Sequence, residues 1–192
     1  MRCYSCGKLS MSVICSTCQE RFLVTQTHTR TIGTLDVVSF YYYPTIAPLL
    51  HTKHKPEGNR IYKFFGKMLF EPFIKDFSEN AEGEVYIVGV DEYVKSGYAH
   101  VAVLTHTMQS KKIKPLHSSL MAQNRVNYSG KNLQFRLANP RNFKYTGKKN
   151  IDVILVDDII TTGITLQEAQ KVLLSHGVNV LFALTLADVE ES

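Results

Sequence analysis

The sequence predicts an α/β domain, with a central and mostly parallel sheet flanked by helices, and a small metal-binding module at its N-terminus. The run Ile154-Leu155-Val156, within a strand predicted from Ile151 to Val156, has no polar alternation, as is typical of a strand buried on both faces of a parallel sheet. A helical pattern follows it from Leu166 to Ser175, as expected for a strand–loop–helix unit. The chain has 192 residues and a hydrophobic fraction of 44%, which suffices for one such domain with a core.

All four cysteines lie near the beginning of the chain, in the pattern Cys-x2-Cys-x8-Cys-x2-Cys: Cys3, Cys6, Cys15 and Cys18. Each Cys-x2-Cys pair directs two thiolates at one ion, and two pairs complete a tetrahedral structural site for Zn²⁺. Disulfides are the alternative, but Met1-Arg2-Cys3 leaves no room for the apolar part of a secretory signal. We therefore expect a cytoplasmic protein whose reducing surroundings favour metal, with an iron–sulfur cluster or redox use as the remaining alternative.

The sequence predicts three units along the chain. They are a four-cysteine zinc finger over residues 1–24, a linking strand and helix segment over 25–80, and the main domain over 81–192. The polar, threonine-rich stretch from Gln26 to Thr34 indicates a linker after the finger. Residues 110–150 show little periodicity and predict short strands and loops.

Four further elements follow from the pattern of apolar residues. Aromatic and β-branched residues from Leu35 to Tyr43 predict a strand. Apolar residues from Ile61 to Ile74 recur at helical spacing, and Pro72 is expected to kink or split that helix. Val85 to Val90 and Val180 to Ala187 predict two more buried strands. Because strands alternate with helices, we expect a ligand at the carboxyl edge of the sheet.

The motif after the central strand points to a phosphate. A tight loop from strand to helix presents backbone N–H groups and the positive end of the helix dipole to one point, which favours an anion. The predicted phosphate loop is Thr161, Thr162, Gly163, Ile164 and Thr165. Asp157 and Asp158 precede it and can accept hydrogen bonds from a sugar's hydroxyls or hold Mg²⁺. The alternative is structural, with Thr165 and Glu168 forming a capping box.

This segment resembles the signature of the type I phosphoribosyltransferase fold, which binds phosphoribosyl pyrophosphate (PRPP). The resemblance implies that Asp157 and Asp158 contact the ribose hydroxyls and that the threonine-glycine loop holds the 5′-phosphate, with Mg²⁺ accompanying the ligand. The fold places its pyrophosphate loop at Asp91-Glu92-Tyr93. A helix is expected from Gly97 to Met108.

The four-cysteine module and this motif together make the whole chain similar to the ComF (ComFC) competence family, whose members are amidophosphoribosyltransferase-like. Three other parts of the chain are similar to the family pattern more loosely. They are Lys53-His54-Lys55 to Gly58; Val88-Gly89-Val90 followed by Gly97-Tyr98-Ala99-His100; and Arg136, Asn139 and Phe143 in that order. Two positions depart from the pattern, because Ser96 stands where arginine is usual and Ala99-His100 where asparagine-glutamine is usual.

The resemblance implies a single-stranded DNA-binding protein of natural transformation. Such a protein handles DNA after its uptake into the cytoplasm and retains a pocket for PRPP, another sugar phosphate or a nucleotide. Other proteins of DNA uptake or recombination are the implied protein partners. The alternative is an active Mg²⁺-dependent phosphoribosyltransferase with an unknown acceptor, in which Asp157 and Asp158 are the catalytic carboxylates.

Charge is distributed unevenly along the chain. No Asp or Glu occurs from Tyr93 to Ile151, where eleven of the 22 Lys and Arg residues lie. A positive groove with interleaved rings suits a nucleic-acid single strand. The predicted DNA-binding residues are Lys111, Lys112, Lys114, Arg125, Tyr128, Lys131, Arg136, Arg141, Lys144, Lys148 and Lys149. The alternative is a solvated basic surface whose rings, Phe135 and Phe143 among them, lie in the core.

Two classes of feature are absent from the sequence. No apolar run approaches the roughly 18 residues that span a bilayer, so no membrane span is expected. The seven histidines are scattered, none pairs with a thiol or carboxylate at metal spacing, and each is interpreted as ordinary.

Overall fold

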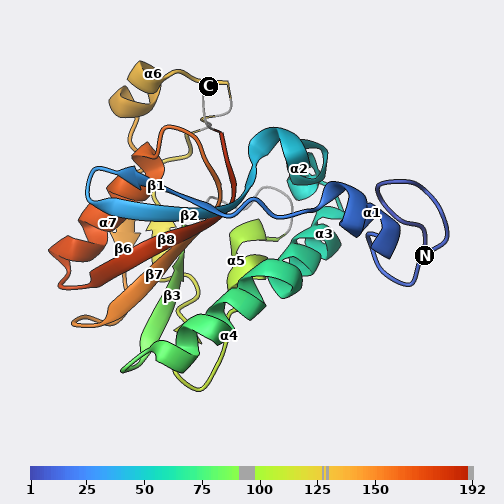
Figure 1. Ribbon diagram of the computed structural model, residues 1–192. Coiled ribbons are helices and arrows are strands. Elements are labelled where there is room, and N and C mark those ends of the chain that lie inside the picture. Colours follow the sequence, from blue (N-terminus) through green and yellow to red (C-terminus); the bar gives the residue numbers. More distant parts are fainter. Residues whose placement is uncertain (91–97, 127, 129, 190–192) are drawn as a thin grey trace.

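The computed structural model describes residues 1–90, 98–126, 128 and 130–189 (Figure 1). Within them, six strands form one sheet in the order β1-β2-β8-β7-β3-β4. Their bounds are β1 His28–Ile32, β2 Leu35–Tyr42, β3 Val85–Gly89, β4 Ile113–Pro115, β7 Asp152–Ile160 and β8 Asn179–Asp188. All neighbouring pairs are parallel except β1 with β2. The expected fold class is therefore confirmed, and the carboxyl ends of the parallel strands meet at one edge of the sheet.

Helices cover both faces of this sheet. On one face lie α2 (Tyr43–Leu50), the 3-10 turn η1 (His51–His54), α3 (Gly58–Phe65), α4 (Glu71–Asn80) and α5 (His100–His106), which share a core with Ile87, Ile154 and Leu184 of the strands. On the other face lie α7 (Ile164–Ser175) and the hairpin of β5 (Leu120–Ala122) with β6 (Phe143–Tyr145), which pack on Val88, Leu155 and Ala183. The short helix α6 (Leu133–Ala138) lies beyond the sheet and contributes no buried residue (Figure 1).

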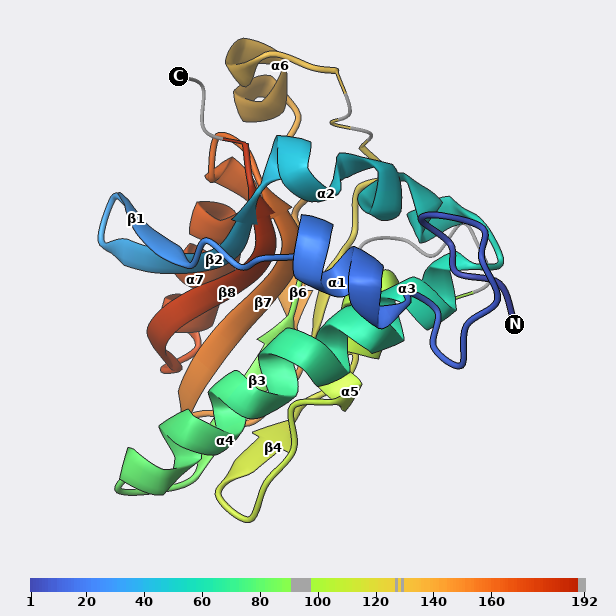
Figure 2. The ribbon, with the colours of Figure 1, turned by 45° about the vertical axis from the view of Figure 1, so that its right-hand side comes forward.

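The predicted helix around Pro72 is interrupted before the proline. A π-helical turn, Gly66–Phe70, joins α3 to α4, and Pro72 occupies the first turn of α4. Phe70 and Glu71 keep helical dihedral angles, so the chain passes from the π-helical turn into α4, where a proline in the first turn is tolerated. Figure 2 shows the three parts as one nearly continuous rod along the sheet.

The expectation of a linker from Gln26 to Thr34 is wrong. Residues His28 to Ile32 form β1, which pairs with β2 through a tight turn at Gly33. Gly33 has φ of 63°, a conformation that favours glycine. The predicted pyrophosphate loop, Asp91-Glu92-Tyr93, and Ser96 lie outside the described residues.

The cysteine module is packed on the main domain. It contains α1 (Ser16–Phe22), and Cys3, Ile14, Cys18 and Leu23 are buried in the same core as the helices that cover the sheet. The buried Tyr41 hydroxyl of β2 donates to the Leu23 carbonyl at 3.0 Å. In Figure 2, α1 lies beside α2 and α3. Across the described residues, no helix combines the length and the apolar character that crossing a bilayer requires.

Candidate functional site

The central strand runs further than its apolar residues indicate. β7 continues to Ile160 and contains both aspartates, rather than ending at Val156. Asp157 pairs in register with Thr185 of β8, and both carboxylates are buried, at 8% exposed for Asp157 and 5% for Asp158. Backbone pairing with β8 therefore fixes their position near the carboxyl edge of the sheet.

A three-residue loop links β7 to α7 and reverses the chain at Gly163. This glycine precedes the helix with φ of 78°, and a Cβ atom there would lie 2.7 Å from Ile32 Cδ1. The helix begins at Ile164, and no side chain caps it. The capping box is therefore wrong, since Thr165 lies inside the helix. Glu168 instead accepts hydrogen bonds from the N–H groups of Arg141 at 3.1 Å and of Asn142 at 2.7 Å.

The start of α7 carries unused donors. Within the described part of the chain, the N–H groups of Thr162 and Gly163 donate to no protein group. The first N–H groups of any helix also lack partners inside it, and α7 has 12 residues whose dipoles add at this end. Thr162 is exposed, and Thr161, Ile164 and Thr165 are half-buried. The predicted phosphate loop thus lies at an accessible and electropositive helix end.

Three side chains from three helical segments converge on Asp158. Lys53 Nζ of η1 donates to Asp158 Oδ2 at 3.0 Å, and the Tyr62 hydroxyl of α3 donates to the same oxygen at 3.1 Å. His100 Nε2 of α5 lies 3.4 Å from it. These partners lie 105 and 96 residues away for Lys53 and Tyr62, so sequence reasoning did not identify them. The only related signals were the Lys53 segment and the departure at His100.

The surroundings keep Asp158 ionised. Burial raises the pKa of this carboxyl, but the charges of Lys53 and His100 and the two hydrogen bonds outweigh burial and hold the pKa well below its usual range. Burial, and then the charge of Asp158, hold the pKa of Tyr62 well above its usual value, so its hydroxyl remains a donor. One donor to Asp157 is a backbone group rather than a side chain, because its Oδ1 accepts the N–H of Asp158 at 2.8 Å.

Two arginines hold Thr161 at the beginning of the loop. The guanidinium of Arg30 donates to the Thr161 carbonyl at 2.5 Å, and that of Arg136 donates to the Thr161 hydroxyl. Arg136 belongs to α6 and was predicted as a DNA contact, whereas Arg30 belongs to β1 and was not predicted. Both bring positive charge to the loop.

The acid-free segment is divided between opposite ends of the sheet. Lys111 and Lys112 precede β4, and Lys148 and Lys149 precede β7, so these four lie at the amino ends of parallel strands. Arg136 contacts the phosphate loop at the carboxyl end. Figure 2 shows α6 and β4 at opposite ends of the molecule. The structure therefore does not bring these five cations to one surface.

Several of the predicted DNA-binding lysines already have partners. Lys114 pairs with Glu84, and Lys112 Nζ donates to the Ala81 carbonyl at 2.5 Å. Lys148 Nζ donates to the Tyr86 hydroxyl at 2.9 Å. These three lysines are exposed all the same, as are Lys111, Arg125, Lys131, Lys144 and Lys149 of the same set.

The expectation that Tyr128 offers an exposed ring is wrong. Tyr128 is 6% exposed, and its hydroxyl donates to the Asn139 carbonyl at 2.6 Å. The guanidinium of Arg141, itself buried, lies 4.6 Å from the ring centroid. Phe143 is buried as expected, but Phe135 is 37% exposed and has Lys131 Nζ 5.1 Å from its ring centroid. Within the acid-free segment, Phe135 is thus an exposed ring next to a cation.

The four cysteines form a compact group of thiols. Their Sγ atoms all lie within 4.8 Å of one another, and Cys6 Sγ lies 3.8 Å from Cys15 Sγ. Thiolates about 2.3 Å from one zinc in a tetrahedron are about 3.8 Å apart. Burial raises the pKa of Cys3, but backbone N–H groups of Cys15, Cys6 and Ser5 outweigh it and lower the pKa to about 6. The group can therefore surround one metal ion.

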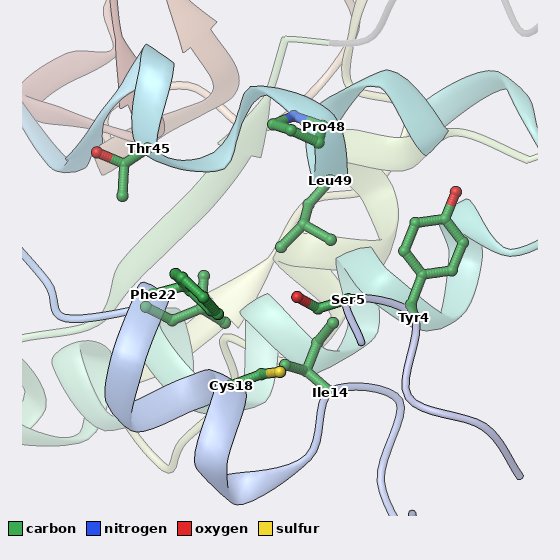
Figure 3. Close-up of a pocket in the computed structure, with 9 residues that line it drawn as sticks. Tyr4, Ser5, Ile14, Cys18, Phe22, Thr45, Pro48 and Leu49 are labelled. Carbon is green, nitrogen blue, oxygen red and sulfur yellow. The ribbon is translucent and has the colours of Figure 1, made fainter. Parts of the chain in front are cut away.

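A cavity of about 350 Å³ lies between the cysteine module and α2 (Figure 3). Most of its lining is apolar and includes Phe22, Pro48 and Leu49, and Ser5 and Thr45 are among the other residues that line it. Among the predicted site residues, Cys18 alone contributes to it. It is separate from the phosphate loop.

Comparison with solved structures finds phosphoribosyltransferases among the similar chains. An adenine phosphoribosyltransferase is similar over 91% of this chain and 91% of its own, with 13% identity and a TM-score of 0.45. A hypoxanthine phosphoribosyltransferase from Staphylococcus aureus is similar over 73% of this chain and 71% of its own, with 20% identity and a TM-score of 0.41. UMP synthase from Leishmania donovani is similar over 73% of this chain, with 15% identity and a TM-score of 0.39, and the chain spans 24% of its length. No family model and no curated protein matches the chain, so the ComF resemblance stays a prediction.

Replacing Lys53 with methionine should destabilise the protein at neutral pH. A folded-state pKa of Asp158 below its ordinary 3.8 gives stability that is present above that value and lost as the pH falls through the folded pKa. Lys53→Met should lower the free energy of unfolding at pH 7 by about 1.5–3 kcal/mol, the range for a hydrogen bond to a charged group. The difference in unfolding free energy between the wild type and the variant should narrow at acid pH. Without Lys53 the pKa of Asp158 is higher, so Asp158 is protonated at a higher pH in the variant than in the wild type. Urea denaturation across pH measures both effects, with the exposed Lys55→Met as control; equal losses in the two variants would contradict this role.

Proposed function

We propose that the loop from Thr161 to Thr165 binds the phosphate of a phosphorylated ribose such as PRPP. The observation that carries the proposal is the set of unused N–H donors at Thr162 and Gly163, at the start of a 12-residue helix. Backbone donors and a helix dipole aimed at one point are the usual means of holding a phosphate. The guanidinium of Arg136 on the Thr161 hydroxyl adds positive charge beside them.

Asp157 and Asp158 are the proposed partners of the ribose hydroxyls. Asp157 is the proposed acceptor for a ligand hydroxyl, because its carboxylate lies near the carboxyl edge of the sheet, one residue before Asp158 in the same strand. Asp158 Oδ2 already accepts from Lys53 and Tyr62. We therefore assign Asp158 to fixing Lys53 and Tyr62 at the edge of the site.

Mg²⁺ is the proposed companion of a pyrophosphate-bearing ligand. Lys53 Nζ at 3.0 Å from Asp158 Oδ2 does not fit direct coordination of a second cation by that oxygen. Asp157 fits better as an oxygen ligand, since Mg²⁺ takes one or two carboxylates together with ligand phosphates. Turnover as a phosphoribosyltransferase is the finer form of this proposal. It needs an acceptor, and release of pyrophosphate from PRPP with candidate acceptors tests it.

The cysteine group is proposed as a structural Zn²⁺ site. The support is the Cys6 to Cys15 sulfur separation of 3.8 Å, which equals the spacing of two thiolates on one tetrahedral zinc. Cys3 and Cys18 belong to the main core, so metal here stabilises the packing of the module on the domain.

Handling of single-stranded DNA is the second candidate function. The observation that favours it is the exposed Phe135 ring with Lys131 beside it, on the helix whose Arg136 contacts the phosphate loop. A single strand of nucleotides offers bases that stack on an exposed ring and phosphates that bind to cations and to a phosphate site. Natural transformation, with other uptake or recombination proteins as partners and the cytoplasm as location, is the proposed setting.

Ribose 5-phosphate should bind to the protein, and two variants should separate its phosphate from its sugar. Thr162→Val removes an exposed hydroxyl from the loop and should weaken binding of both inorganic phosphate and ribose 5-phosphate. Asp157→Asn should lower the affinity for ribose 5-phosphate about tenfold, or by about 1.4 kcal/mol, and should leave the affinity for inorganic phosphate unchanged. Calorimetric titration measures these affinities, and Thr29→Val, an exposed threonine of β1, is the control. No binding by the wild type at millimolar ligand would exclude the proposed site.

Purified protein should contain one zinc per chain. Cys6 is exposed, so Cys6→Ser removes a ligand without loss of packing, and metal content should fall well below one per chain. Chelation should lower the thermal unfolding midpoint of the wild type and have little effect on Cys6→Ser. Elemental analysis and thermal melts measure these quantities, with the exposed Thr17→Ala as control. Disulfides found by mass spectrometry in protein kept reduced would contradict a metal site.

Single-stranded DNA should bind with a strong dependence on salt. Log affinity should fall with log salt by about 0.7 per phosphate contacted. Phe135→Ala should lower affinity by about 1–3 kcal/mol with little change in slope, because stacking releases no counterions. Lys131→Ala should reduce the slope instead. Fluorescence anisotropy with an oligonucleotide gives both values, and Phe22→Ala, which removes an exposed ring from the cysteine module, is the control. Affinity that is independent of salt would rule out this function.

A further inference from the structure

The edge hairpin of β1 and β2 forms one wall of the phosphate loop. Arg30 of β1 donates to the Thr161 carbonyl at 2.5 Å, from 131 residues away in the chain. Two residues further on, Ile32 lies against Gly163, so that a Cβ there would be 2.7 Å from Ile32 Cδ1. A Cβ at Gly33, in the turn, would lie 3.0 Å from Gln167 Nε2 of α7. Three successive contacts therefore join this hairpin to the loop and the helix after it.

A buried carboxylate holds Arg30 in place. Asp188, the last residue of β8, is 1% exposed, and its Oδ1 lies 3.2 Å from Arg30 Nη2. His28 Nε2 lies 3.5 Å from the other oxygen of Asp188. The His28 ring stacks on Tyr42 with centroids 4.2 Å apart and planes 11° apart. The guanidinium therefore has a fixed position, since its charge is matched by a carboxylate that backbone pairing fixes in the sheet.

The position of this guanidinium sets the direction of a loop N–H. A trans peptide unit is planar, so its carbonyl and its N–H point in opposite directions. The carbonyl of Thr161 and the N–H of Thr162 belong to one such unit. Because Arg30 holds that carbonyl toward β1, the N–H of Thr162 points away from β1. That N–H is one of the donors without a protein partner among the described residues.

We propose that Arg30 is a positioning residue for the phosphate loop, holding the Thr161–Thr162 peptide so that the Thr162 N–H faces a bound phosphate. This inference rests on the proposed phosphate site. Arg30 itself does not touch the ligand in this arrangement. It acts through the Thr161 carbonyl, and Asp188 acts through Arg30. The alternative role is structural, in which Arg30 only neutralises the buried carboxylate.

A double-variant cycle separates these two roles. Arg30→Met should lower the unfolding midpoint, because it leaves the buried Asp188 without this cation. It should also lower the affinity for ribose 5-phosphate about tenfold. Adding Asp188→Asn removes the unmatched charge and should restore most of the unfolding midpoint. Affinity for ribose 5-phosphate should stay low in the double variant, because the Thr161 carbonyl still has no guanidinium. Arg21→Met, on the cysteine module, is the matched control and should change neither quantity.

A second measurement needs no ligand. Backbone order parameters of Thr162 and Gly163, from nitrogen-15 relaxation, should fall below about 0.6 in Arg30→Met and in the double variant but not in the control. A double variant that regains both stability and affinity would overturn the proposal. If the wild type fails to bind ribose 5-phosphate, the proposed function is wrong, and the order parameters alone then decide whether Arg30 positions the loop. Unchanged order parameters would overturn it in that case.

Discussion

The ionised carboxylate of Asp158, buried near the end of the central strand, is the constraint on which one face of this protein depends. A buried charge is costly unless it is paired and hydrogen-bonded. Here the partners come from η1, α3 and α5, as Lys53, Tyr62 and His100. Satisfying one side chain of β7 therefore requires three separate helical segments to meet at the carboxyl edge of the sheet. The same apolar core that buries Ile154 and Val156 of this strand holds those segments in place.

The neighbouring strand repeats this arrangement with different residues. Asp188 is the last residue of β8, just as Asp158 lies near the end of β7. Asp188 is buried and pairs with Arg30 of the edge hairpin. Each carboxylate thus recruits a cation from an element outside the parallel strands. The pair of Arg30 and Asp188 is joined to the predicted phosphate loop, since Arg30 also contacts Thr161. A charge pair fixed by the sheet consequently holds one end of a segment in which the N–H groups of Thr162 and Gly163 lack partners among the described residues.

The central strand, the loop and its helix were predictable from sequence because their information is local. An apolar run, two carboxylates and a Thr-Thr-Gly turn follow one another within a short stretch of chain. β1 was not predictable, because Thr29, Arg30 and Thr31 are polar and edge strands need no continuous apolar run. Missing this strand meant missing Arg30. The partners of Asp158 were unpredictable for another reason. The sequence around a single lysine, tyrosine or histidine does not indicate a contact with a residue so distant in the chain.

Basic residues that are close together in the sequence lie on different surfaces of this protein. Eleven cations without an acid suggested one surface, yet parallel strands send their amino and carboxyl ends to opposite edges. Lys148 consequently meets Tyr86 at one end while Arg136 meets Thr161 at the other. The guanidinium of Arg136 lies 5.5 Å from the ring centroid of the buried Tyr128, so this ring stabilises the position of Arg136 beside the loop. The residues that were grouped by charge are thus divided between opposite edges of the sheet, and Arg136 is the one of this pair that contacts the predicted phosphate loop.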